Sequence, residues 1–236
     1  MIKVCLDPGH GGKDPGAVGH GYKEKDLTLR IAIEAGKILE DYGVEVVYTR
    51  TSDVYVELQD RAKIANTAKV DSFTSIHINS ATNNIANGVE TFNYTNSQSG
   101  KPLSTSIQDS LVNSKVFQNN RGVKEANFAV LRLTNMPACL VELGFITNKD
   151  DVDILSSKWK LLAMLVAHGV LRHHGINGIQ QTSIDVSDYA ISASKKAVQK
   201  GIFADGDNDG HVDNPQGYLT REQLAVVLDR LGLLDD

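Results

Sequence analysis

The length, composition and charge of the chain limit the kinds of protein it can be. The chain has 236 residues, of which 41% are hydrophobic and 22% are charged, values typical of a globular protein. The formal net charge of −5 and the lack of a cluster of basic residues argue against a nucleic-acid partner. No apolar stretch approaches the roughly 20 residues that cross a bilayer, so we expect no membrane partner either.

Short apolar strands alternate with amphipathic helices in the first three quarters of the chain. We predict strands over residues 2–6, 44–48, 72–76, 89–93 and 138–141. Helical spacing of apolar residues predicts helices from Asp26 to the stop at Gly43, and over 58–68, 104–112 and 159–173. Strands that alternate with helices predict an α/β fold, in which helices cover both faces of a mostly parallel, twisted sheet.

The composition changes near residue 177, and we divide the chain there. Residues 1–176 form the predicted α/β domain, and the polar stretch over 177–185 is typical of a linker. Residues 186–236 hold two helical segments around an acidic, glycine-punctuated loop. They are too few to bury a large core, so we predict a small helical C-terminal domain.

Four ionisable residues of the first domain lie at comparable places in the predicted sheet. His10 comes just after the first strand, His77 follows the third, Glu142 ends the strand over 138–141, and Glu24 lies in the loop before the first helix. In an open parallel sheet the carboxyl ends of the strands share one edge, where ligands bind. We therefore expect these four side chains to converge.

Two histidines and one carboxylate are typical of catalytic zinc, because they leave the fourth tetrahedral position open. Zinc in such a site acidifies water and polarises a carbonyl group. A second carboxylate that does not bind the metal is then needed to move a proton. Glu24 and Glu142 supply both carboxylates, but the residue pattern alone leaves open which of them binds the metal.

The surrounding motifs resemble the N-acetylmuramoyl-L-alanine amidase type 3 family. The resemblance covers about residues 1–175, and its motifs stand in order at 7–12 (DPGHGG), 24–27 (EKDL), 75–79 (SIHIN) and 141–148 (VELGFITN). It implies that His10, Glu24 and His77 bind zinc and that Glu142 is the catalytic acid/base. It also implies that the enzyme cuts the amide bond between N-acetylmuramic acid and L-alanine in bacterial peptidoglycan.

Other residues have weaker assignments. By the resemblance, Asn79 would contact the substrate, and Arg61 matches a family position whose role is substrate binding or structural. Asp7 either shapes a turn or holds His10 through its second ring nitrogen. We predict structural roles for the remaining candidate histidines, which are His20, His168, His173 and His174.

The acidic loop of the C-terminal domain resembles a calcium-binding loop. Asp205, Asp207 and Asp209 occupy its first ligand positions, but Gln216 stands where such loops have a bidentate glutamate. Weak calcium binding and a solvated acidic turn both remain open. The flanking segments resemble one surface-layer homology repeat, which implies binding to a secondary cell-wall polymer, although a dimerisation element or a spacer is an alternative.

The function we predict is zinc-dependent lysis of the bacterial cell wall. The N-terminus lacks the cationic and apolar regions of a signal peptide. We therefore expect a bacteriophage or prophage endolysin that is made in the host cytoplasm and acts on the wall after release, with an amidase of spore formation, or an enzyme trimmed of its signal peptide, as the alternatives. Two other hypotheses are a zinc peptidase that cuts within the stem peptide and a non-catalytic wall-binding protein with a structural metal site.

Overall fold

The computed structural model of the chain describes residues 1–176. The predicted linker, the C-terminal domain and its acidic loop lie outside the described residues, so the domain boundaries and the calcium loop stay predictions.

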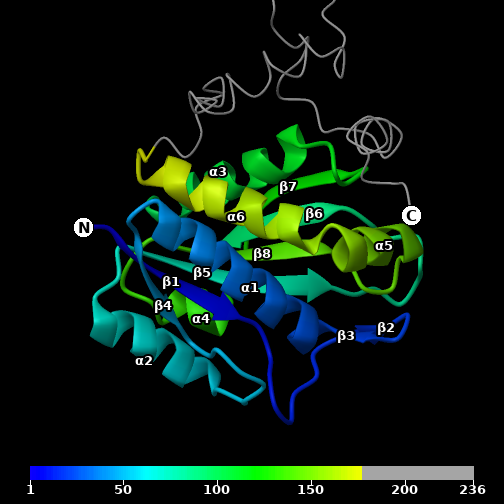
Figure 1. Cartoon of the computed structure of the whole chain (residues 1–236), viewed down its shortest axis with the longest axis horizontal. Helices are drawn as coiled ribbons and strands as arrows, with labels where there is room; N and C mark the ends of the chain where they lie inside the picture. The colour runs from blue at the N-terminus through cyan, green and yellow to red at the C-terminus, as the bar shows by residue number, and fades with distance from the viewer. Residues whose placement is uncertain (177–236) are drawn as a thin grey trace, which may run out of the picture. The chain divides into compact units, whose positions relative to one another are not determined.

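A six-stranded sheet forms the centre of the described part, with the strand order β4-β1-β5-β8-β6-β7 (Figure 1). Strands β4, β1, β5 and β8 are parallel to one another, β6 is antiparallel to β8, and β7 is parallel to β6. The predicted mostly parallel sheet is therefore confirmed. The strands span β1 Lys3–Pro8, β4 Glu45–Tyr48, β5 Ser72–Asn79, β6 Val89–Asn93, β7 Asn120–Glu125 and β8 Ala138–Phe145, and a separate hairpin joins β2 Val18–Gly19 to β3 Tyr22–Lys23.

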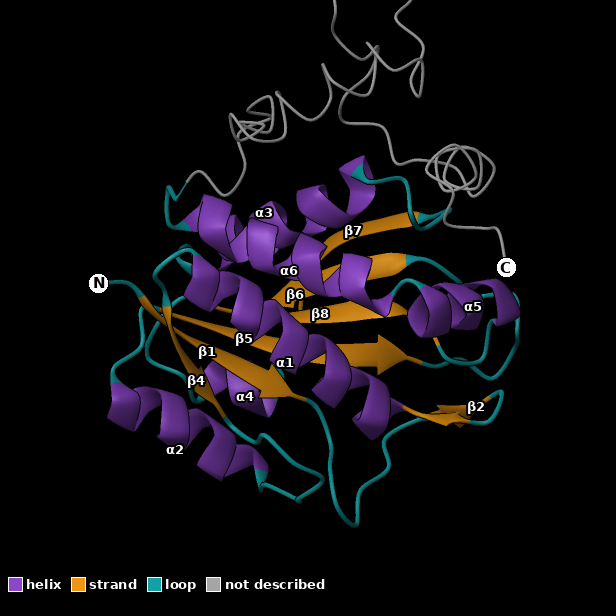
Figure 2. Cartoon of the chain, in the orientation of Figure 1, coloured by secondary structure: helices purple, strands orange, loops and turns teal. Residues whose placement is uncertain are grey.

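Helices cover both faces of the sheet, as predicted. Helices α1 (Glu24–Asp41), α3 (Gly100–Asn113) and α6 (Trp159–His173) lie on one face, and α2 (Leu58–Ala68) and α4 (Ala129–Arg132) lie on the other (Figures 1 and 2). Helix α5 (Lys149–Ser157) precedes α6. Within residues 1–176 no single helix is long and apolar enough to cross a membrane. Helices α5 and α6 have that length and apolar character only when they are taken together, and the bend between them is 82°.

Each face of the sheet has its own apolar core, because successive residues of a strand point to opposite faces. Leu6, Ile76 and Val141 belong to the larger core beneath α1, α3 and α6. Cys5 and Leu140, their neighbours along the strands, belong to the smaller core beneath α2 and α4. This alternation assigns each functional side chain of the central strands to one face.

Several element boundaries differ from those predicted. Strands β5 and β8 run to Asn79 and Phe145, so His77 and Glu142 lie within strands rather than after them. Helix α1 begins at Glu24, with Lys23 and not Asp26 as its N-cap. Strand β7 and helices α4 and α5 were not predicted, because β7 is polar with no buried residue, α4 is a single turn and α5 begins with charged residues.

Candidate active site

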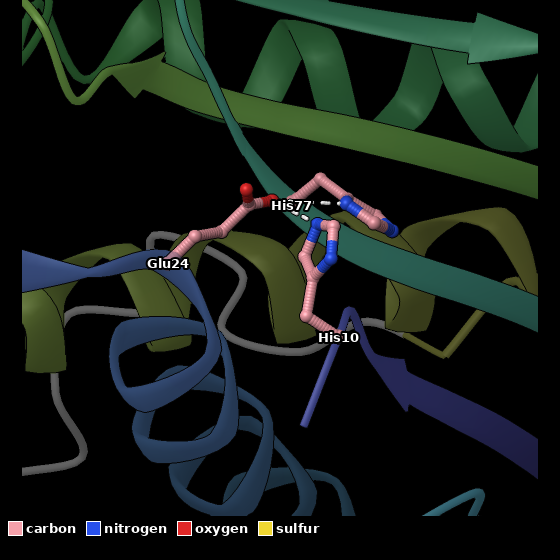
Figure 3. Close-up of side chains that lie close together, drawn as sticks. All are labelled: His10, Glu24 and His77. Atoms are coloured by element: carbon pink, nitrogen blue, oxygen red, sulfur yellow. Dashed lines mark hydrogen bonds and ion pairs between the residues drawn. The ribbon is translucent and has the colours of Figure 1, made fainter. Parts of the chain in front are cut away.

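The side chains of His10, Glu24 and His77 converge on one point, as the sequence predicts (Figure 3). Glu24 Oε1 lies 3.1 Å from His10 Nε2 and 3.0 Å from His77 Nδ1. The two imidazole rings are nearly perpendicular, with their centroids 4.9 Å apart. Three segments that are distant in sequence, the loop after β1, the start of α1 and the end of β5, therefore supply one cluster.

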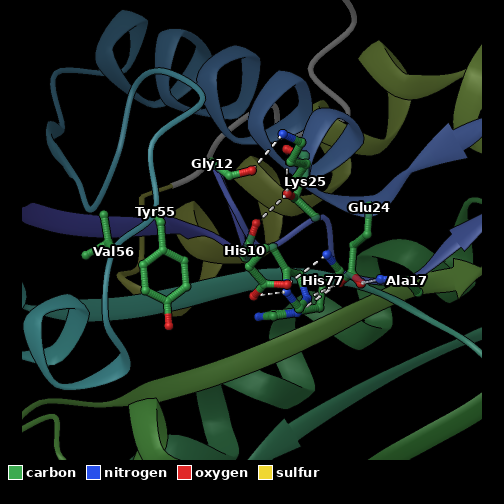
Figure 4. Close-up of polar contacts among 12 residues, drawn as sticks. His10, Gly12, Ala17, Glu24, Lys25, Tyr55, Val56 and His77 are labelled. Atoms are coloured by element: carbon green, nitrogen blue, oxygen red, sulfur yellow. Dashed lines mark hydrogen bonds and ion pairs between the residues drawn. The ribbon is translucent and has the colours of Figure 1, made fainter.

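The loop after β1 positions His10 through an uncommon backbone conformation. His10 has a φ of +61°, in the left-handed region that few non-glycine residues adopt. Arg61 fixes this loop: its Nη1 donates to Pro8 O and its Nη2 donates to His10 O, each at 2.7 Å. Lys25 Nζ donates to Gly12 O at 3.0 Å, as Figure 4 shows. The conformation of the loop is thus determined by side chains from α1 and α2.

Two glycines leave room for the histidine rings. A Cβ atom at Gly9 would lie 2.4 Å from the His77 ring, and one at Gly16 would lie 2.6 Å from both His10 and Glu24. Both distances are too short for real atoms, so the DPGHGG motif and the residues after it need glycine for close packing as well as for turning.

Glu24 is held by its surroundings as an ionised carboxylate. Its Oε2 accepts a hydrogen bond from Ala17 N, and its Oε1 accepts one from Ile78 N, both at 2.9 Å. Burial alone would raise the pKa of Glu24, but the hydrogen bonds and charges of His10 and His77 outweigh it and lower the pKa well below its usual range. The carboxylate is therefore ready to bind a cation.

The interaction with Glu24 also raises the pKa of both histidines. Burial lowers the pKa of His10, but hydrogen bonds to Glu24 and Asp14 outweigh it and raise the pKa to about 9. The pKa of His77 is also raised, because the Glu24 carboxylate outweighs the effect of burial. A cation that occupies the site must displace these protons.

Asp14, which the sequence pattern did not indicate, holds the second ring nitrogen of His10. The distance from His10 Nδ1 to Asp14 Oδ2 is 2.8 Å, so Asp14 plays the role considered above for Asp7. Asp7 instead accepts hydrogen bonds from Thr49, Arg61 and Ser75 beneath the loop. A spacing of four residues from His10 was the available signal, but the two side chains meet across a turn in which His10, Gly11 and Gly12 all have positive φ.

The donor set fits a zinc ion. Zinc in proteins binds imidazole nitrogen and carboxylate oxygen at about 2.0–2.2 Å. The three ligand atoms lie within 4.8 Å of one another, close enough to share one ion. Because each histidine already faces Glu24 Oε1, the site needs only small side-chain movements to take the ion.

Glu142 lies beside the cluster without joining it. On strand β8 it is paired with His77 of β5 on one side and with Glu90 of β6 on the other. Its Oε2 atom is buried and has no hydrogen-bond partner among residues 1–176. Burial raises the pKa of Glu142 to about 7, because it outweighs the opposing charge of His77. The nearby carboxylates of Glu24 and Glu90 act on this pKa in the same direction as burial. A carboxyl group with that pKa can both accept and donate a proton near neutral pH.

A pocket of about 360 Å³ opens beside these residues on the α2/α4 face of the sheet. His10, His77 and Glu142 line it together with apolar and aromatic side chains that include Tyr55, Val56, Phe128, Val130 and Leu140. The carboxyl group and both histidines therefore meet a space that a ligand can enter.

The other residues singled out from the sequence differ in whether they line this pocket. Arg61 lines it, although the guanidinium is buried and donates to the His10 loop. Asn79 is half-buried at the end of β5, and its Nδ2 donates to Glu90 Oε1 at 2.7 Å. The four histidines expected to be structural lie outside the cluster: His20 contacts Thr147 O, and His168, His173 and His174 belong to or follow α6.

Comparison with known proteins identifies the family that the chain resembles. Residues 4–172 match the N-acetylmuramoyl-L-alanine amidase family Amidase_3. The sporulation-specific N-acetylmuramoyl-L-alanine amidase of Bacillus subtilis is 43% identical over 187 residues, which cover 77% of this chain and 68% of that protein. The endolysin of Bacillus phage SPP1 is 43% identical over 160 residues, covering 64% of this chain and 58% of that protein.

Solved structures give the same result. The catalytic domain of CwlV, an N-acetylmuramoyl-L-alanine amidase from Bacillus (Paenibacillus) polymyxa, has a TM-score of 0.71 and 32% identity, covering 75% of this chain and 99% of that one. The N-acetylmuramoyl-L-alanine amidase AmiC2 of Nostoc punctiforme has a TM-score of 0.70 and 40% identity, and the match covers 74% of this chain and 97% of that one. The chain therefore belongs to the N-acetylmuramoyl-L-alanine amidase family.

Proposed function

We propose that this chain hydrolyses the amide bond between N-acetylmuramic acid and L-alanine in bacterial peptidoglycan. The observation that carries the proposal is the buried Oε2 of Glu142, which has no hydrogen-bond partner in the described part of the chain and lies at a pocket that His10 and His77 also line. A structural metal site has no use for an extra carboxylate at an open pocket, whereas a hydrolase needs one to move protons.

We infer that zinc is the cofactor and that His10, Glu24 and His77 hold it. When bound, zinc supplies a Lewis acid that polarises the scissile carbonyl and makes water a better nucleophile. The support for zinc is the donor set of two nitrogens and one carboxylate oxygen around one point. The role of the chain is to keep this set in place, through Arg61 beneath the loop, Asp14 at His10 and the backbone N–H of Ile78 at Glu24.

Glu142 is the proposed proton carrier. It takes the proton of the attacking water and delivers it to the nitrogen of L-alanine as the amide bond breaks, which leaves a lactyl carboxylate and a free amine. The pKa of about 7 suits both halves of this transfer, because the group is easily ionised before attack and easily protonated before the nitrogen departs.

Asn79 and Arg61 have supporting places in the proposal. Asn79 stands two residues beyond His77 and is oriented by Glu90, so we propose that it contacts the substrate at the edge of the site. Arg61 lines the pocket, but most of its donors are used by Asp7 and the backbone of the His10 loop. We propose that its main effect on substrate binding passes through that loop.

The cellular setting is a further part of the proposal. The phage endolysin relative supports lysis of a bacterial host by an enzyme made in its cytoplasm, and the sporulation-specific relative supports a role in spore formation. Expression in a host with and without membrane permeabilisation tests the first setting: lysis that requires permeabilisation supports it, and lysis without it contradicts it. Secondary-polymer and calcium binding by residues 186–236 remain proposals from the sequence.

Digestion of purified peptidoglycan by the whole chain tests the reaction, with and without a chelator. The proposal requires chelator-sensitive release of peptides that carry N-terminal L-alanine, and recovery when zinc is returned. New termini at other stem residues would support the peptidase alternative, and binding without any new terminus would support the non-catalytic wall-binding protein.

A further inference from the structure

A row of charged side chains continues from Glu142 across the sheet to the edge strand β7. Glu142 of β8 is paired with Glu90 of β6, and Phe92 of β6 is paired with Lys124 of β7. Paired residues and alternate residues of a strand share a face, so these side chains lie on the same face as the pocket. Phe92 packs against the core beneath α2 and α4, which confirms this assignment.

Glu90 organises the row as a buried carboxylate. It is 4% exposed, and its Oε2 accepts hydrogen bonds from Lys124 Nζ and, at 2.7 Å, from Arg121 Nε. Its Oε1 accepts from Asn79 Nδ2. Burial would raise the pKa of Glu90, but the hydrogen bonds of Lys124 and Arg121 outweigh it and lower the pKa. Glu90 is thus ionised and fixes two cations beside the site.

The two positive charges of Arg121 and Lys124 exceed the one negative charge of Glu90, and some of their N–H donors stay available for a ligand. Their side chains are 34% exposed for Arg121 and 40% exposed for Lys124. The Arg121 guanidinium lies over the Phe145 ring at 4.8 Å, and among residues 1–176 its Nη1 and Nη2 atoms have no hydrogen-bond acceptor. An arginine that is held in place and partly exposed to solvent, with a lysine beside it, is suited to bind a carboxylate ligand.

The place of Glu142 indicates how the substrate is oriented and therefore which part of it lies near Arg121 and Lys124. Under the proposed function Glu142 contacts the leaving nitrogen of L-alanine, and Glu142 lies between His77 of β5 and Glu90 of β6. A peptide that continues past Glu142 therefore runs toward β6 and β7. Two strand spacings from β8 to β7 amount to about 10 Å. One or two extended peptide residues span about 3.5–7 Å, and the long side chains of Arg121 and Lys124 cover the rest of that distance.

We propose that Arg121 and Lys124 form a subsite for the carboxylate of the second stem residue, the acidic residue that follows L-alanine in peptidoglycan. This inference rests on the proposed function. The subsite makes the enzyme prefer stem peptides whose α-carboxylate at the second residue is free to stem peptides in which that carboxylate is amidated.

Matched substrates test the subsite. Two soluble muropeptides carry the stem L-Ala-γ-D-Glu-L-Lys amide and differ only in whether the D-glutamate α-carboxyl is free or amidated. Both are assayed with the zinc-loaded whole chain, with Arg121→Gln, with Lys124→Gln, and with Lys101→Gln as the control. Lys101 is an exposed cation of α3 on the opposite face of the sheet, so its substitution removes the same charge without touching the row.

We expect the unmodified chain to prefer the free carboxylate by at least about tenfold in kcat/KM, chiefly through KM. Arg121→Gln should remove most of this preference by slowing only the carboxylate substrate, Lys124→Gln should remove part of it, and Lys101→Gln should leave it intact. Equal losses on both substrates, or no preference at the start, overturn the subsite while leaving the proposed reaction standing. Failure of the unmodified chain to cut either muropeptide at L-alanine overturns the proposed function itself.

Discussion

The two faces of the sheet differ in what the same strands place on them. Leu6, Ile76 and Val141 are fully buried against α1, α3 and α6. The residues that follow them are Asp7, His77 and Glu142, which line the pocket on the α2/α4 face. One residue along each strand separates a side chain that stabilises the fold from one that belongs to the site.

This difference shows how the fold separates stability from chemistry. The larger core excludes water and fixes the strands, whereas the smaller core beneath α2 and α4 leaves space for a pocket. Substitutions of adjacent residues should therefore have opposite effects: a change on one face should alter stability and leave metal binding intact, and a change on the other should do the reverse.

The largest expected effect is the loss of the metal in His77→Ala. Removal of one of two imidazoles leaves the Glu24 carboxylate and His10 as an incomplete set, so bound zinc and turnover should both fall to background. Zinc content by atomic emission and the rate of alanine release measure the two losses. A full equivalent of zinc in this variant would refute the ligand assignment.

The matched change on the other face is Ile76→Ala. Deletion of this fully buried side chain should lower the free energy of unfolding by about 2–5 kcal/mol. Zinc stoichiometry and kcat, measured at a temperature where the variant stays folded, should match those of the unmodified chain. Denaturant unfolding gives the first quantity. A variant that keeps its stability but loses zinc would show that the two faces are not separable.

A smaller effect is expected for Asp14→Asn, which removes the negative charge behind His10. Loss of such a partner typically lowers metal affinity by about 10–100-fold. Competition with a chelator of known affinity measures the change, and Asp41→Asn, at the exposed end of α1, is the control. Unchanged affinity would show that Asp14 does not support the ligand.

The subtlest expected effect is the release of protons when zinc binds. Zinc needs neutral imidazole, but in the metal-free chain the pKa of His10 is about 9 and that of His77 is raised. Zinc affinity should therefore fall as the pH is lowered below about 9. Calorimetry at pH values near neutrality, in buffers with different ionisation enthalpies, should detect net proton release that declines above this pKa. Release of no protons near neutral pH would contradict the basic histidines.

Much of this architecture was predictable from the sequence. The periodicity predicted α2, β6 and α6 with the bounds that the structure has. The predicted strand ends also indicated that His10, His77 and Glu142 converge with Glu24, because residues near the carboxyl ends of parallel strands share one edge of the sheet. The choice of His10, Glu24 and His77 as the metal-binding set came from the family resemblance. The element bounds rest on patterns that are local to one strand or one helix, whereas the convergence rests on the general geometry of a parallel sheet.

The features that were missed depend on the conformation of a loop or on contacts between distant segments. Asp14 meets His10 across a turn in which His10, Gly11 and Gly12 have positive φ. The contacts of Arg61 with the His10 loop join residues more than 50 positions apart. Strand β7 is polar, and it contributes to the site only through the pairing that brings Lys124 and Arg121 to Glu90. None of these relations leaves a periodic signal in the sequence.

The division of labour between the metal ligands and Glu142 is the central claim, and Glu142→Gln tests it most directly. Zinc content and turnover are measured on the same preparation, with Glu40→Gln, an exposed glutamate of α1, as the control. Because Gln keeps the shape but cannot carry the proton, the variant should hold a full equivalent of zinc while kcat falls by about 10²–10⁴-fold. Turnover close to that of the control, or loss of the zinc, would contradict the account.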